Sequence, residues 1–79
     1  MRKIKAMSVY RHFKGNLYYV IGVSVHTKTE EKMVVYHTLY GDRQMYVRPL
    51  NMFLKEVPKE KENPTGQKYR FKFLNEQLE

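Results

Sequence analysis

The residues best suited to chemistry in this chain are cations that alternate with aromatic side chains. They fall in the segments 10–14, 46–48 and 68–73. Arginine and lysine bind phosphate and aromatic faces stack on bases, so this mixture is typical of a surface for nucleic acid or nucleotides. The candidate phosphate-binding residues are Arg11, His12, Lys14, Arg48, Lys68, Arg70 and Lys72. The candidate stacking residues are Tyr10 and Tyr46.

The same alternation also has a purely structural explanation. In a small β domain most aromatic side chains fill the core, and the cations between them in the last strand are then its solvent face. Arg48 has structural alternatives as well, because it can pair with Asp42 or cap a helical turn after Pro49. These alternatives stay open at the level of sequence.

Other kinds of site lack the residues they need. The histidines His12, His26 and His37 are far apart and cysteine is absent, so we expect no metal site. No serine or threonine lies in a nucleophile-elbow motif, and the glycines are isolated rather than gathered in a phosphate-binding loop. We therefore expect a non-enzymatic binding protein with no catalytic residues and no cofactor.

Length and charge restrict the interpretation further. The chain has 79 residues and a formal net charge of +7, which predicts a single domain attracted to anionic partners. The basic start at Arg2, Lys3 and Lys5 is not followed by an unbroken apolar run, and no segment reaches the roughly 20 apolar residues of a membrane helix. We expect a cytoplasmic protein with no membrane partner.

The apolar pattern predicts strands. Leu17 to Val25 alternates with a period of two, and Met33 to Tyr40 resumes the alternation, so the two form a long β-hairpin. A four-residue loop would place Val25 opposite Val34 and a half-buried, backbone-bonded His37 opposite Gly22, although loop length leaves the register open. Gly22 marks a bend or bulge.

Shorter elements complete the predicted fold. Ser8 to Phe13 forms a first strand before a turn at Gly15 and Asn16, and Met45 to Val47 forms another short strand. Pro49 begins one helical turn that packs apolar residues on the core, and Tyr69 to Phe73 is the last strand. Residues 59–67 lack apolar side chains and are expected to form a mobile loop, and residues 75–79 a frayed tail. The sequence thus predicts one mainly β domain over residues 1–79, a small five-stranded SH3-like open barrel.

The segment from Tyr10 to Phe53 resembles domain of unknown function 1653, a family of short bacterial and phage proteins. The matching pieces are Tyr10 to Asn16, His26-Thr27, Val34 to Tyr36, Leu39-Tyr40, Val47 to Pro49 and Met52-Phe53. The chain departs from the family pattern at Tyr19, where an acidic residue is usual, and at Tyr46, where tryptophan is usual. The resemblance implies a compact, mostly β domain in a bacterial protein and carries no established activity.

Three functions follow from these observations. A nucleic-acid-binding module explains the charge and the cation–aromatic segments, and it predicts binding that weakens steeply with salt. A homo-oligomer that holds a nucleotide or phosphorylated metabolite between subunits is the second, and stoichiometry distinguishes it from the first. A protein-interaction adapter is the third, for which the charge would be incidental.

Overall fold

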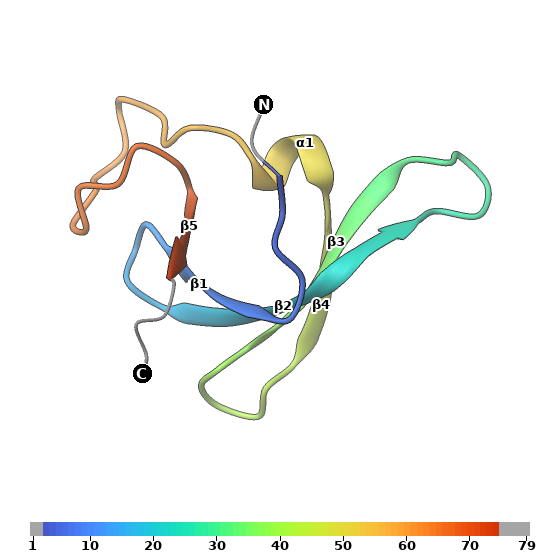
Figure 1. Cartoon of the computed structure of the whole chain (residues 1–79). Helices are drawn as coiled ribbons and strands as arrows, with labels where there is room; N and C mark the ends of the chain where they lie inside the picture. Colours follow the sequence, from blue (N-terminus) through green and yellow to red (C-terminus); the bar gives the residue numbers. More distant parts are fainter. Residues whose placement is uncertain (1–2, 75–79) are drawn as a thin grey trace.

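Five antiparallel strands form one sheet in the computed structural model, which describes residues 3–74 (Figure 1). The elements are β1 (Ser8–His12), β2 (Leu17–Val25), β3 (Lys32–Thr38), β4 (Met45–Pro49), α1 (Leu50–Phe53) and β5 (Phe71–Leu74). The strand order is β4-β3-β2-β1-β5, so β4 and β5 are the two edges and the sheet does not close. The predicted mainly β open barrel, with a helical turn before its last strand, is confirmed.

The central hairpin contains the predicted irregularity at Gly22. The pairing of β2 with β3 shifts register between Val20 and Gly22, which is the geometry of a β-bulge. The register itself differs from a four-residue loop, because Val23 and not Val25 lies opposite Val34. The connection occupies residues 26–31 and is closed by a hydrogen bond of 2.8 Å from the His26 amide to the Glu31 carbonyl.

The change of register also gives His37 a different partner across the strand pair. It lies opposite Tyr19 rather than Gly22. Its ring is half-buried, and Nδ1 lies 2.8 Å from the carbonyl oxygen of Thr38. The expected half-buried histidine with a backbone partner is therefore confirmed, with a different neighbour across the strand pair.

The core occupies one face of the sheet, here called the inner face. Its buried cluster consists of Tyr10, Val20, Val34, Tyr36, Phe53 and Phe71. The Phe53 ring, supplied by α1, stacks on Phe71 of β5 with ring centroids 4.0 Å apart. Successive strand residues point to opposite faces, so Tyr46, Arg48 and His12 share this inner face and Arg11 does not. The helical turn after Pro49 thus packs its apolar side chain where the sequence predicted.

Polar side chains attach the long segment between α1 and β5 to the rest of the domain. Asn63 Nδ2 donates a 2.6 Å hydrogen bond to the Gln67 carbonyl, and Thr65 Oγ1 donates one of 3.0 Å to the carbonyl of Phe13. Gln67 is only 7% exposed, and its Nε2 donates to the carbonyls of Arg11 and Tyr69. Residues 59–67 lack apolar anchors, and hydrogen bonds join Thr65 and Gln67 of this loop to Phe13 and Arg11. The mobility expected of the loop stays a prediction.

Residues 1–2 and 75–79 lie outside the described part of the chain, and with them Arg2 and the predicted frayed tail. Within residues 3–74, no helix is long and apolar enough to cross a membrane.

Candidate functional site

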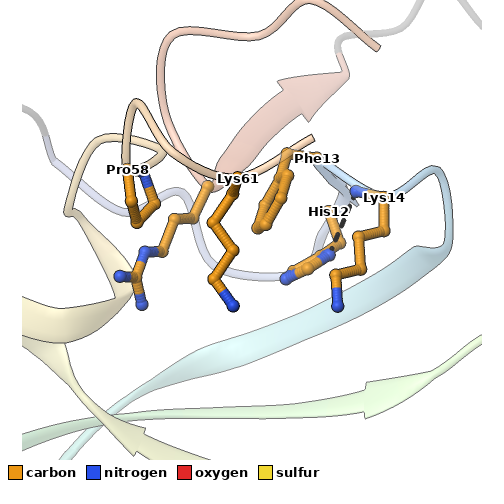
Figure 2. A pocket seen from close by; sticks show the side chains of 6 residues that line it. His12, Phe13, Lys14, Pro58 and Lys61 are labelled. Atoms are coloured by element: carbon orange, nitrogen blue, oxygen red, sulfur yellow. Dashed lines mark hydrogen bonds between the residues drawn. The ribbon is translucent and has the colours of Figure 1, made fainter. Parts of the chain in front are cut away.

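A cavity of about 230 Å³ opens beside the turn between β1 and β2. We call it the His12 cavity, and it is lined by His12, Phe13, Lys14, Pro58, Lys61 and Arg70. Figure 2 shows the nitrogen ends of His12, Lys14 and Lys61 pointing to the same side. Two distant parts of the chain therefore meet here: the end of β1 with its turn, and the segment between α1 and β5.

The β1–β2 turn fixes His12 and Lys14 against each other. Gly15 adopts a φ of 111°, a conformation that L side chains rarely adopt, and its amide donates a 2.7 Å hydrogen bond to the His12 carbonyl. The Lys14 amide donates to His12 Nδ1 at 3.2 Å. Because Nδ1 accepts this bond, the proton of the neutral imidazole is on Nε2, which is left to donate.

The surroundings keep His12 neutral. Burial, together with the positive charges of Arg48, Lys14 and Arg70, lowers the pKa of His12 to about 4. At neutral pH the imidazole is therefore an uncharged hydrogen-bond donor in the middle of a group of cations.

Arg70 enters the cavity from a bend just before β5. Its amide donates to the Lys55 carbonyl at 3.0 Å, and its own carbonyl accepts the Phe13 amide at 2.8 Å, so the backbone is held on both sides. The Nε atom is buried and has no hydrogen-bond partner in the described part of the chain. No carboxylate pairs with this guanidinium, since the one ion pair within residues 3–74 joins Lys68 to Glu56.

Arg48 lies next to the His12 cavity on the inner face. Its Nε donates a 3.3 Å hydrogen bond to the Tyr36 hydroxyl, and the guanidinium carbon lies 5.5 Å from the centre of the Phe71 ring. Neither structural alternative for Arg48 is found: it does not pair with Asp42, and α1 has no side-chain cap. Contacts with aromatic residues hold the guanidinium, and no carboxylate within residues 3–74 forms an ion pair with it.

Three tyrosines continue the inner face beyond Arg48. We call Tyr18, Tyr40 and Tyr46 the tyrosine surface. The Tyr18 and Tyr40 hydroxyls lie 3.2 Å apart, and the Tyr46 ring lies 6.0 Å from that of Tyr36. Tyr40 and Tyr46 are 46% and 47% exposed. Burial, and to a lesser degree the hydrogen bond to Tyr40, raises the pKa of Tyr18, so its hydroxyl is neutral at physiological pH.

Of the two candidate stacking residues, one is exposed in the structure and the other is buried. Tyr46 is exposed beside Arg48 as a stacking role requires. Tyr10 is only 3% exposed and its ring packs against Phe53 and Phe73, so its faces are not accessible to a base. The expectation for Tyr10 is corrected: in a small barrel this aromatic is needed to fill the core.

The remaining predicted cations lie elsewhere. Arg11 pairs across the sheet with Lys72, and its Nε donates a 2.8 Å hydrogen bond to Gln67 Oε1. Lys68 Nζ lies 3.9 Å from Glu56 Oε2. A second cavity of about 380 Å³, here called the Lys68 cavity, is lined by Gly66, Gln67, Lys68, Tyr69, Lys72 and Phe73. The expected single row of Lys68, Arg70 and Lys72 is thus divided, because only Arg70 reaches the His12 cavity.

Sequence reasoning missed some of the residues at this site. Lys61 lies in the segment expected to be mobile, and nothing local in the sequence marks it as a cavity residue. Tyr18 lies in β2, where alternation alone does not separate a core ring from a surface ring, and Tyr40 lies two residues beyond the end of β3. The signal for Tyr40 was its place beside the Gly41 turn, where a side chain is readily exposed.

Comparison with known proteins identifies the family. No curated protein matches the chain. The crystal structure of a DUF1653 protein from Bordetella bronchiseptica is similar, with 30% sequence identity and a TM-score of 0.75 over 94% of this chain and 91% of that one. Residues 8–73 match the family described as a protein of unknown function, DUF1653. This match covers most of the chain, and the chain belongs to the DUF1653 family.

Proposed function

We propose that this protein is a non-enzymatic module that binds a phosphate-bearing ligand, most favourably a nucleic-acid strand, along its inner face. The observation that carries the proposal is the His12 cavity, where Lys14, Lys61 and Arg70 converge without a carboxylate partner among residues 3–74. Like charges held together are unfavourable in the free protein, and an anion between them relieves that repulsion.

The cavity also offers the hydrogen bonds that phosphate needs. The guanidinium of Arg70, the two ammonium groups and the Nε2–H of His12 are donors, and none of the described lining residues carries a carboxylate. Hydrogen bonds between charged donors and phosphate oxygens are roughly twice as strong as neutral ones. This donor set favours an anion over a neutral ligand.

The tyrosine surface favours a nucleic acid over inorganic phosphate. Tyr40 and Tyr46 are half exposed, and Tyr46 lies in the same strand as Arg48, two residues away on the same face. Aromatic side chains beside a basic groove accept unstacked bases, and each stack contributes about 1–3 kcal/mol. A flexible single strand can place a phosphate in the cavity and bases on these rings.

Fluorescence anisotropy with labelled single-stranded RNA and DNA tests the proposal. With one phosphate in the cavity and the next at Arg48, the logarithm of the binding constant should fall with the logarithm of salt concentration at a slope of about −1.4. Absence of binding to both strands at micromolar protein in low salt would refute it. A salt-independent interaction would also count against it, because phosphate contacts release counterions.

A homo-oligomer that binds a small nucleotide is the second candidate, and exposed apolar side chains favour it. Met45 and Val47 are 57% and 58% exposed on the edge strand β4, and Val25 of β2 is 57% exposed. Unpaired edges with apolar side chains are surfaces that self-association covers. Light scattering beside thermal shift with nucleoside monophosphates tests it: a nucleotide-stabilised oligomer supports this candidate, and an indifferent monomer excludes it.

A further inference from the structure

We infer that the His12 cavity receives the terminal phosphate of a nucleic-acid strand, a phosphate monoester, in preference to an internal phosphodiester. This inference rests on the proposed function and specifies which part of the strand enters the cavity. Arg48 and the tyrosine surface then meet the nucleotides that follow the end.

The charge in the cavity fits a monoester better than a diester. Lys14, Lys61 and Arg70 bring three formal positive charges to a space of about 230 Å³. An internal diester carries one negative charge, whereas a monoester carries about −1.5 to −2 at neutral pH. Only a terminal monoester supplies a second negative charge to the three cations.

The number of donors leads to the same choice. His12 contributes Nε2–H as a neutral donor, since its Nδ1 already accepts the Lys14 amide. With the two ammonium groups and the guanidinium, four side chains can donate, and Phe13 and Pro58 complete the lining without polar side-chain groups. A monoester presents three terminal oxygens to these donors, and a diester only two free ones. The third oxygen of the monoester accepts a hydrogen bond from a donor that a diester would leave without a partner.

The surroundings of the cavity give the strand a path away from its end. Arg48 does not line the cavity, but its charge acts on His12, and its guanidinium packs over Phe71, whose ring lies 4.9 Å from the His12 ring. Arg48 is therefore placed for the next phosphate along the strand. Tyr46, two residues before Arg48 on β4, extends this path to a base.

The test compares oligonucleotides of one sequence with a fluorescent base in the middle, so that both ends stay free. They carry a 5′-phosphate, a 3′-phosphate or hydroxyls at both ends. A fourth oligonucleotide, two nucleotides longer with hydroxyl ends, adds the same charge as internal diesters. We expect one phosphorylated end to raise affinity at least tenfold over both hydroxyl-ended strands, and we expect Lys14→Ala with Lys61→Ala to abolish that gain.

The matched control is Lys28→Ala with Lys59→Ala, which removes two exposed lysines that do not line the cavity. This variant should keep the tenfold preference. Equal affinity for all four oligonucleotides, or an equal gain from the longer strand, would overturn the inference and leave the proposed function standing. Failure of every oligonucleotide to bind would refute both.

Discussion

The two cavities of this domain contain the same kinds of residue and differ in what their cations contact. In the His12 cavity, Lys14, Lys61 and Arg70 have no carboxylate partner within the described structure. Beside the Lys68 cavity, Lys68 lies near Glu56 and Arg11 is held by Gln67. The cations of the His12 cavity have no carboxylate within ion-pair distance among residues 3–74, whereas at the Lys68 cavity a carboxylate lies beside Lys68 and an amide holds the neighbouring Arg11.

The difference shows why a cation count does not locate a binding site. The ion pair of Lys68 is exposed and contributes little stability, yet its carboxylate repels phosphate at the same place. Gln67 is buried and fixes Arg11 to the loop, which makes this arginine a structural residue. The partners of each cation, rather than the net charge of +7, separate the two regions.

Removing two lysines from each cavity should give the largest contrast. Lys14→Ala with Lys61→Ala removes two charge-assisted contacts, each contributing about 1.4 kcal/mol, so affinity for single-stranded nucleic acid should fall about 100-fold. Lys68→Ala with Lys72→Ala lowers the net charge equally and should change affinity by less than about threefold. Anisotropy titrations measure both. Equal losses in the two variants would show that only overall charge attracts the ligand.

For stability, we expect a large effect from a residue of the Lys68 cavity, Gln67. Gln67→Leu leaves the carbonyls of Arg11 and Tyr69 without their side-chain donor, so the free energy of unfolding should fall by about 2 kcal/mol. Urea denaturation measures this change, and Gln44→Leu at an exposed position is the control. A destabilised Gln67→Leu protein that still binds nucleic acid when folded sharpens the comparison. An unchanged unfolding midpoint would contradict the structural role of Gln67.

A tyrosine on the inner face should contribute less than the lysine pair. Tyr46→Ala removes an exposed ring, so folding should be unaffected and affinity should fall about tenfold through loss of one base stack. Met45→Ala, at the neighbouring residue on the outer face, is the matched control and should bind as the unmodified protein does. If both variants bind equally well, the tyrosine surface does not contact the strand.

The smallest effect concerns pH. The pKa of His12 is lowered to about 4 in the folded protein from 6.5, so the unfolded chain takes up a proton first as pH falls. The stability contributed by neutral His12 is complete above about pH 6.5 and decreases as pH falls toward 4. For the unmodified protein, the urea concentration at the unfolding midpoint should therefore be lower at pH 5 than at pH 7.

His12→Asn should reduce this pH dependence, because asparagine can still accept the Lys14 amide and does not titrate. His26 and His37 remain in both proteins, so the difference between them reports His12. An identical pH dependence in the two proteins would place the titrating group elsewhere.

Local sequence signals were sufficient for the elements of this fold. Alternation located the strands, Gly22 marked the bulge, and Pro49 marked the start of the helical turn whose Phe53 is buried. The register of the hairpin could not be predicted from the sequence, because it depends on a loop at residues 26–31 that is closed by its own hydrogen bonds. One more or one fewer loop residue changes which side chains face each other.

The candidate site was predicted only in part, because its residues come from distant segments. Lys61 joins His12 through a loop whose anchors, Thr65 to Phe13 and Gln67 to Arg11, are contacts between residues more than 50 positions apart. Tyr10 and Tyr46 are alike in sequence, and only the packing of Phe53 and Phe73 against Tyr10 separates the core ring from the exposed one.

Amide chemical shifts measured while a 5′-phosphorylated single strand is added to ¹⁵N-labelled protein test the central claim most directly. The account predicts the largest shifts at Lys14, Lys61 and Arg48, with Lys68 and Lys72 nearly unchanged. The largest shifts at Lys68 and Lys72 would contradict it and move the binding site to the other cavity.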